Sequence, residues 1–300
     1  MTFYEKITRN LPGIPYSHVY PQRDVNPVAR TVRVRIVHNP NDSMRIVQGR
    51  IQKFVRGLNI RMPHATAVLP GTNPRKNVLR HRGNRFFYLT DISDAFGSVE
   101  LDRLVEVICA LDASVNREDM TLALRTFCFV REGKQGLVTG GLASQDLFNV
   151  YAAVLLDKPL GELAKKHNLR YTRFLDDLTF SGSESIGKHK RRAIRECVSQ
   201  AGMRIGHHKS KVYDLAKGPI VINGIGIASG WRKTFTPKHY VQKLLRHMHH
   251  VETGRVDVSE INRVNGMMGA FLHATGGREF CWTRTEMRVL KAYRRARNRA

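Results

Sequence analysis

The chain has 300 residues, with 50 Lys and Arg against 25 Asp and Glu, which gives a formal net charge of +25. Such an excess repels itself in a compact fold, and a polyanionic partner, above all nucleic acid, is the usual reason for it. The longest apolar run, residues 150–156, is too short for a bilayer, and residues 1–6 lack the apolar core of a signal peptide. We therefore expect no membrane association.

Hydrophobic content and cysteine spacing further limit the kind of protein that the chain can be. Hydrophobic residues make up 42% of the chain, enough for a sizeable core. The four cysteines are widely scattered and form no Cys-x-x-Cys pair, so they fit neither a zinc site nor a disulfide framework. We expect reduced thiols and a cytoplasmic location.

The predicted elements alternate between strands and helices. Strict alternation over residues 31–37 predicts a strand that buries Ile36 and its apolar neighbours and aims Arg33 and Arg35 to the other side. Turn residues and periodicity then predict further elements in chain order. These are a helix over 43–58, a strand over 86–90, helices over 99–110 and 144–166, a β-hairpin over 171–181, a helix over 188–201, a strand pair over 219–227 and helices beyond 237. The mixed order favours an α+β fold.

Two aspartate motifs stand at the ends of strand-like runs. Asp91 follows Phe-Phe-Tyr-Leu-Thr, and Asp176 and Asp177 follow Tyr-Thr-Arg-Phe-Leu at the predicted hairpin tip. Carboxylates on separate strands can hold two divalent ions against a polyphosphate, and Mg²⁺ needs only a few of them. The alternative is that Asp-Asp at a hairpin tip is turn chemistry alone. Both motifs in this order favour the metal site, with two Mg²⁺ ions.

At these residues the chain resembles the reverse transcriptases. The resemblance is in Asp91-Ile-Ser-Asp-Ala-Phe96, in Gly140-Gly-Leu-Ala-Ser144 with Asn149, in Phe174-Leu-Asp-Asp177 and in Gly202-Met-Arg-Ile205 with Lys209, within a match over about residues 33–266. It implies a right-hand polymerase with fingers to about residue 90, a palm over 91–230 with finger insertions, and a thumb with a basic C-terminal helix over 231–300. The activity that it implies is RNA-directed DNA synthesis from deoxynucleoside triphosphates.

The resemblance also assigns roles to single residues. Asp91, Asp176 and Asp177 are then the catalytic carboxylates, and the Ile92 carbonyl is an additional metal ligand. Nucleotide binding falls to Phe96, which would exclude a ribose 2′-hydroxyl, to Lys209 near the leaving phosphates, and to Thr139, Gly140, Arg33 and Arg35. A core phenylalanine, an exposed lysine and a solvated strand face are the alternatives for Phe96, for Lys209 and for the two arginines.

Within that family, the compact length and several short elements resemble the bacterial retron enzymes, which copy part of a dedicated structured RNA and stay bound to the product. Asn77-Val-Leu-Arg-His81 resembles their Asn-Ala-x-x-His element, and Val221-Ile-Asn-Gly224 stands where they have Val-Thr-Gly. Asn77 and His81 are thus expected to contact the RNA. The alternative is that residues four apart lie on the same helix face without a role in RNA binding. The chain departs from these patterns at three places. It has Gln145 where the family usually has Pro, Phe174-Leu175 where it usually has Tyr-Ala, and Asn223 where the retron element has Thr.

The C-terminal helix is a second candidate RNA surface. Arg288, Lys291, Arg294 and Arg295 form a basic face, and no acidic residue follows Glu286. A solvated helix end is the alternative, but RNA contact is favoured. We expect a structured non-coding RNA and its DNA product as partners, an accompanying effector protein, and a role in antiviral defence. Alternatives are a defence-type reverse transcriptase that makes DNA with little or no template, and a catalytically idle RNA-binding scaffold.

Overall fold

The computed structural model of the chain describes residues 1–11, 18–26, 31–130, 136–206, 209–230, 234–254, 258–277 and 283–299, of which 18–20, 22–26, 31–35 and 298–299 are described by backbone alone. The helices are α1 (Phe3–Thr8), α2 (Asp42–Gly57), α3 (Pro74–Arg80), α4 (Leu101–Leu111), α5 (Arg117–Phe127), α6 (Ser144–Ala152), α7 (Lys158–Lys166), α8 (Lys188–Gln200), α9 (Lys238–Thr253), α10 (Val258–Thr275) and α11 (Arg284–Arg299). The strands are β1 (His18–Asn26), β2 (Thr31–Asn39), β3 (Phe86–Ser93), β4 (Arg170–Phe174), β5 (Asp177–Gly182), β6 (Arg204–Ile205), β7 (Lys211–Asp214), β8 (Ile220–Ile222) and β9 (Ile225–Ile227). In the described part of the chain, no helix is long and apolar enough to cross a membrane.

The chain divides into two compact units, which are described separately. Unit 1 comprises residues 1–70, 90–178 and 187–210, and unit 2 comprises residues 71–89, 179–186 and 211–300. These units do not coincide with the fingers, palm and thumb expected from the sequence, because each unit combines segments that are distant along the chain. The functional division stays a prediction.

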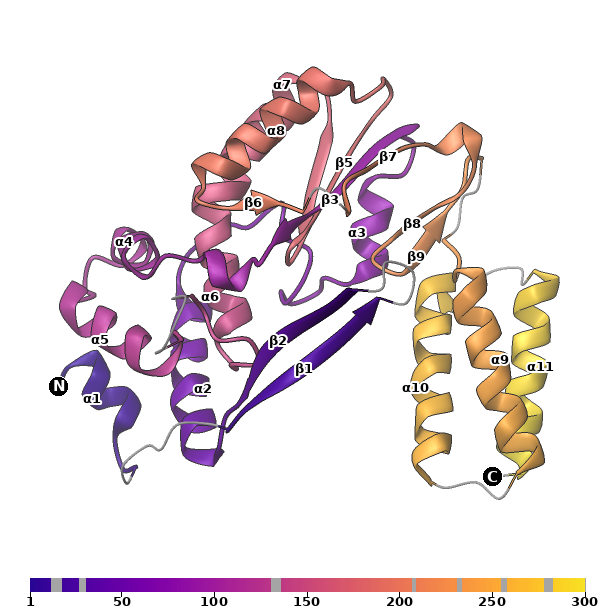
Figure 1. Ribbon diagram of the computed structural model, residues 1–300, viewed down its shortest axis with the longest axis horizontal. Helices are drawn as coiled ribbons and strands as arrows, with labels where there is room; N and C mark the ends of the chain where they lie inside the picture. The colour runs from indigo at the N-terminus through magenta and orange to yellow at the C-terminus, as the bar shows by residue number, and fades with distance from the viewer. Residues whose placement is uncertain are drawn as a thin grey trace. The chain divides into compact units, whose positions relative to one another are not determined.

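Unit 1 consists of helices and the strand segments that hold the predicted catalytic residues. Asn41 caps α2 by accepting the Met44 N–H at 2.9 Å, and Val47, Ile51 and Val55 give this helix a buried face. Figure 1 shows α7 and α8 together; α7 packs on β4, and α8 packs on β6. β1 and β2 form an antiparallel pair.

The main sheet has the order β4-β5-β3-β6, and β7 also pairs with β3. β3 is antiparallel to β7, with Phe86 opposite Asp214, and to β6, with Ile92 opposite Ile205. The predicted hairpin over 171–181 is confirmed, since β4 and β5 are neighbours and only Leu175 and Asp176 separate them.

In unit 2, β8 and β9 form an antiparallel pair that packs with α3. The helices α9, α10 and α11 lie side by side (Figure 1) around a core that includes Leu244, Met248, Phe271 and Val289. Apolar residues three or four apart on each helix build this core and leave the basic residues outside.

Three local predictions need correction. Ile36 is 57% exposed, so the prediction that it faces a core is wrong. The predicted helix over 144–166 contains a π-helical turn, Ala153–Asp157, between α6 and α7. The helix predicted from residue 99 begins at Leu101, because a 3₁₀ turn, Phe96–Ser98, precedes it.

Candidate active site

The sheet brings together the backbone segments that contain two of the predicted carboxylates. Asp91 lies in β3, and Asp176 lies in the turn between β4 and β5, directly before Asp177, the first residue of β5. β3 and β5 are neighbours in the sheet, and the Ile92 backbone N–H donates to the Asp176 carbonyl at 2.8 Å. Residues far apart in the sequence are therefore held together by backbone pairing, as a two-carboxylate site requires.

A glycine makes room for the first carboxylate. The Gly206 N–H donates to the Asp91 carbonyl at 2.8 Å, and a Cβ on Gly206 would lie 2.4 Å from Asp91 Oδ1. No larger residue fits here without moving the carboxylate. The sequence gives no signal for this requirement, because the contact joins segments that are distant along the chain.

Asp91 has two oxygens in different surroundings. The Lys209 Nζ donates to its Oδ2 at 2.7 Å, whereas Oδ1 is buried and has no hydrogen-bond partner among the described residues. An unsatisfied buried carboxylate oxygen is costly unless a cation or donor supplies the missing interaction. Lys209, predicted to approach the leaving phosphates, here contacts the carboxylate itself.

This donor set fits a hard divalent cation. Within the described ranges no group of three His, Cys, Asp or Glu side chains is arranged to hold a metal ion. Mg²⁺, however, is commonly bound by one or two carboxylates, with water and substrate phosphates completing the shell. Asp91 Oδ1 and the carboxylate of Asp176 supply oxygens of that kind. Ile92, whose carbonyl was predicted as a further ligand, lies beside them in β3 with a buried side chain.

A fully buried ion pair supports the turn that contains Asp176. The Arg173 side chain is 0% exposed, and its Nε and Nη2 donate to Asp157 Oδ1 and Oδ2, each at 2.8 Å. Burial opposes the charge of Arg173, but the attraction of Asp157 and its hydrogen bonds outweigh burial, so the pKa of Arg173 lies above its ordinary value. Asp157 also accepts from the Tyr171 hydroxyl at 2.8 Å. Asp157 is also the last residue of the π-helical turn Ala153–Asp157. Such turns within α-helices are often found at functional sites.

The third nitrogen of the Arg173 guanidinium holds the backbone next to Asp176. Its Nη1 donates to the Leu175 carbonyl at 3.1 Å and to Asn149 Oδ1 at 2.9 Å. Leu175 has a φ of 54°, a left-handed conformation that is unfavourable for a branched side chain. Arg173 therefore stabilises the conformation from which Asp176 projects. The sequence analysis missed this role, although an arginine inside the apolar strand Tyr171–Phe174 was a usable signal.

Phe96 begins the 3₁₀ turn Phe96–Ser98, and two residues separate it from the end of β3. Its ring makes an edge-on contact with Phe148 at 5.5 Å between centroids, and its carbonyl accepts from the Leu137 N–H at 2.9 Å. The Phe148 ring in turn lies 5.3 Å from the Arg173 guanidinium carbon. Phe96 is partly exposed, so it is not an ordinary core residue. Its role in sugar selection stays a prediction.

The predicted nucleotide-binding turn packs against β2. The His38 N–H donates to the Thr139 carbonyl at 2.7 Å, and a Cβ on Gly140 would lie 2.4 Å from the His38 carbonyl oxygen. Gly140 also has a φ of 95°, so this position needs glycine for two reasons. Arg33 and Arg35 are in β2, but their side chains lie outside the described residues.

Two of the predicted RNA-contacting residues are buried in unit 2. Asn77 and His81 are both 0% exposed; Asn77 Nδ2 donates to Asn223 Oδ1 at 2.6 Å, and His81 Nδ1 lies 2.7 Å from Ser181 Oγ. Their side chains face other parts of the protein rather than a ligand. They can influence RNA binding by holding the surrounding segments, and direct contact stays a prediction.

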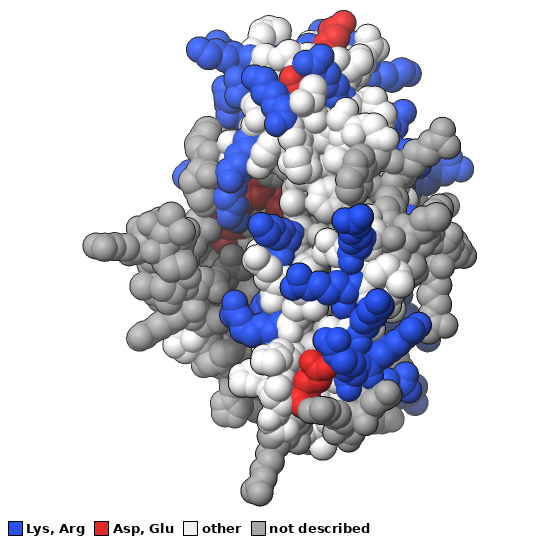
Figure 2. Space-filling view, turned by 90° about the vertical axis from the view of Figure 1, so that its right-hand side faces the viewer, with Lys and Arg blue, Asp and Glu red and all other residues white. Residues whose placement is uncertain are grey.

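The cations of α11 are on the outside of the bundle. Arg288, Lys291, Arg294 and Arg295 are exposed, and Arg295 pairs with Glu252 of α9 at 2.5 Å. Figure 2 shows one face of the molecule on which Lys and Arg side chains are abundant and acidic ones sparse. This arrangement suits a polyanion.

Comparison with known proteins gives the family context. Residues 25–252 match the family described as reverse transcriptase (RNA-dependent DNA polymerase). The chain is 27% identical over 196 residues to the retron Mx65 reverse transcriptase of Myxococcus xanthus, covering 61% of this chain and 46% of that protein. It is 22% identical over 254 residues to the retron Ec83 reverse transcriptase of Escherichia coli, covering 80% and 78%. The chain thus spans about half the length of the Myxococcus relative.

Solved structures show a similar fold. Telomerase from Candida albicans in complex with a TWJ fragment of telomeric RNA aligns with a TM-score of 0.54 at 11% identity, over 99% of this chain and 58% of that one. Apo telomerase from Candida tropicalis aligns with a TM-score of 0.51 at 11% identity, over 94% and 63%. At such low identity the likeness concerns the fold alone.

Proposed function

Because this chain belongs to the reverse transcriptase family, we propose that it synthesises DNA from deoxynucleoside triphosphates on an RNA template. The observation that supports this most is the backbone hydrogen bond from Ile92 to Asp176, which holds the turn of Asp176 beside the β3 segment that contains Asp91. An idle scaffold would have no need of a buried Asp91 oxygen that lacks a hydrogen-bond partner among the described residues. The α+β right-hand polymerase fold agrees with this activity.

Two Mg²⁺ ions are the proposed cofactor, held by Asp91 and Asp176 with Asp177 and the Ile92 carbonyl as further ligands. When bound, such ions activate the primer 3′-hydroxyl and stabilise the leaving pyrophosphate. The protein's own contribution is to fix the carboxylates in place: Gly206 leaves room for Asp91, and Arg173 holds the turn of Asp176. Lys209, now paired with Asp91, is close enough to neutralise negative charge at the same site.

The remaining site residues are proposed to select and hold the nucleotide. Phe96, braced by Phe148, would exclude a 2′-hydroxyl. Thr139 and Gly140 would contribute backbone groups to the nucleotide site, in a turn that packs against His38 of β2. Arg33 and Arg35 would bind the triphosphate.

We further propose a retron-type enzyme of the cytoplasm, with a structured non-coding RNA as template and partner, its DNA product bound, and an accompanying effector protein in antiviral defence. The retron relatives and the exposed cations of α11 support this. Arg288, Lys291, Arg294 and Arg295 would contact RNA phosphates, which positions the RNA without reading its sequence.

Single-nucleotide incorporation on an RNA template tests the activity. With an annealed DNA primer and Mg²⁺, changing one template base should change which deoxynucleotide is added. Addition independent of the template base would favour the defence-type alternative that makes DNA with little or no template. Absence of any addition, with RNA binding retained, would favour the scaffold.

A further inference from the structure

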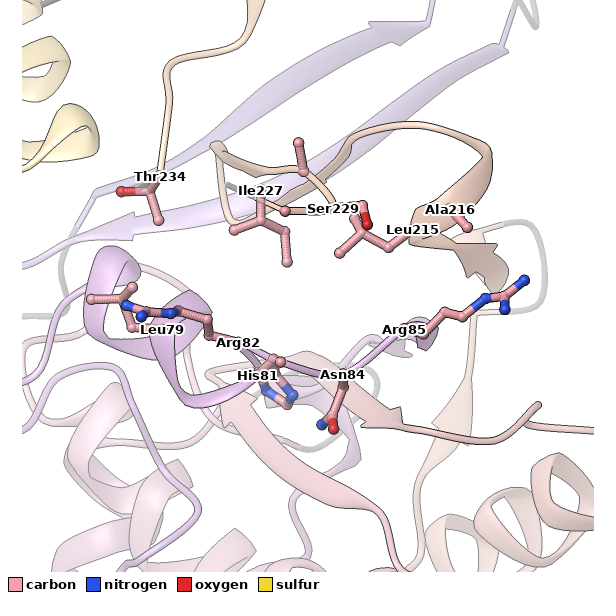
Figure 3. A pocket seen from close by; sticks show the side chains of 13 residues that line it. Leu79, His81, Arg82, Asn84, Arg85, Leu215, Ala216, Ile227, Ser229 and Thr234 are labelled. Carbon is pink, nitrogen blue, oxygen red and sulfur yellow. The ribbon is translucent and has the colours of Figure 1, made fainter. Parts of the chain in front are cut away.

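Unit 2 contains a cavity of about 300 Å³ that the proposed catalytic mechanism does not use. One wall is formed by Leu79 and residues 81–85, at the end of α3, and the other is formed by Leu215, Ala216 and residues 227–230. Figure 3 shows Leu79, Arg82 and Arg85 on one side of the gap and Ile227, Ser229 and Ala216 on the other. The volume is at the lower end of the range for small-molecule sites, so it suits one small group rather than a peptide or a helix.

Hydrogen bonds behind the walls keep the cavity open. Asn77 on α3 is bonded to Asn223 between β8 and β9 at 2.6 Å, which ties the first wall to the second. Ser181 Oγ accepts from Asn84 Nδ2 at 2.7 Å and lies 2.7 Å from His81 Nδ1. In Figure 3 the side chains of His81 and Asn84 accordingly point away from the gap. A preformed cavity lowers the entropy cost of binding.

The lining combines apolar surface with positive charge. Leu79, Leu215 and Ile227 provide apolar surface, and Arg82 and Arg85 are exposed at its edge. The Arg85 guanidinium binds Asp214 with two hydrogen bonds of 2.8 Å, which lower the pKa of Asp214 to about 2. No Asp or Glu is among the described residues that line the cavity, so its charge is complementary to an anion.

We propose that this cavity binds a single unpaired nucleotide of an RNA, with the base between the apolar walls and the phosphate near Arg82. Sequence-specific RNA recognition mostly targets unpaired bases turned out of a stem, which bind between aromatic or apolar side chains or on guanidinium planes. Exposed Ser229 and the backbone of Gly83 and Gly230 offer hydrogen-bonding groups to the base edge. The proposal rests on the proposed RNA partner and adds a site where that RNA is read by more than charge.

The proposal is tested by measuring the affinity of the protein for three RNA hairpins that have the same stem. One has a single bulged 2-aminopurine, the second has an abasic bulge, and the third is fully paired. The wild-type protein should bind the first about tenfold more tightly than the other two, because one base is placed on the cavity walls. Binding should also change the fluorescence of the 2-aminopurine.

Two variants, each with a matched control variant, test whether the base preference arises in the cavity. Ala216→Phe fills the cavity from an exposed position and should remove the preference for the bulged base. Val221→Phe adds the same ring at another exposed position outside the cavity and should keep that preference. Arg82→Gln should lower the affinity for the bulged hairpin more than Arg80→Gln does. Arg80 is exposed too, but it does not line the cavity.

Equal affinity of the wild-type protein for the bulged and abasic hairpins would overturn the proposal, as would a preference that survives in Ala216→Phe. Extension of a generic primer on an RNA template is measured in the same preparations. It should be unchanged in Ala216→Phe, because the catalytic carboxylates belong to unit 1. A wild-type protein that extends no primer would count against the proposed function, and the base preference would still be decided by binding.

Discussion

The turn of Asp176 and the outer face of α11 use charge in opposite ways. At the turn, Arg173 and Asp157 are fully buried and paired through two hydrogen bonds with defined geometry. On α11, Arg288, Lys291 and Arg294 are exposed. Buried charges must be satisfied individually, whereas exposed ones act through their number and are screened by salt. We therefore expect catalysis to depend on single residues, and RNA binding to depend on the total number of exposed cations.

The largest effect is expected from Gly206→Ala. The added Cβ would lie 2.4 Å from Asp91 Oδ1 and displace the carboxylate. Misplacement of a catalytic group by about 1 Å can cost about 100-fold in rate, so primer extension should fall by that order. Gly187→Ala is the matched control, because its Cβ meets nothing within 4 Å and its φ is −67°. Equal rates in the two variants would contradict the tight fit at Asp91.

Arg173→Met tests the buried pair. It leaves Asp157 buried without its partner and should lower the free energy of unfolding by about 3–5 kcal/mol. Arg192→Met removes an exposed pair with Glu196 and should cost less than about 1 kcal/mol. Both are measured by chemical denaturation.

The double variant Arg173→Met/Asp157→Leu separates positioning from stability. Replacing both buried charges should recover most of the lost stability. Primer extension should stay low, because the Leu175 carbonyl still lacks the Arg173 donor. Recovery of stability and of rate together would show that Arg173 only stabilises the fold.

A smaller change is expected from Phe96→Ala, which should admit the 2′-hydroxyl. The ratio of kcat/KM for ribonucleotides to that for deoxynucleotides should rise about tenfold. Phe3→Ala removes a ring that packs on Phe54 instead, at 4.8 Å, and should leave the ratio unchanged. The same ratio in wild type and Phe96→Ala would mean that Phe96 only packs on Phe148.

The smallest effect on catalysis is expected from replacing Arg288, Lys291, Arg294 and Arg295 by glutamine. RNA affinity should fall, and the slope of log affinity against log salt should flatten by roughly 0.7–0.9 for each lost phosphate contact. Extension of a generic primer should change little. The matched control removes four exposed cations on or near α7 and α8, Lys165, Lys166, Arg170 and Lys188. If both sets flatten the slope equally, α11 has no special part in binding.

The sequence predicted the local features of the site but not the contacts that support it. Asp91 and Asp176 were identifiable because each follows a strand-like run of the sequence and belongs to a motif with a known order. Gly206 and Asp157 were not, because their importance depends on Asp91 and Arg173, which local patterns cannot pair with them. The prediction that β2 buries Ile36 was wrong because alternation indicates two faces without saying that either is covered.

The central claim is that Asp91 and Asp176 together hold the divalent ions for DNA synthesis. Asp91→Asn and Asp176→Asn each remove a negative ligand at nearly constant volume, and Asp102→Asn does the same at an exposed position of α4. Incorporation of one deoxynucleotide on an RNA template, measured across a Mg²⁺ titration with folding and RNA binding checked in parallel, tests it directly. We expect no incorporation at any Mg²⁺ concentration in the first two variants and wild-type rates in the third. Wild-type incorporation in either Asp91→Asn or Asp176→Asn would contradict the account.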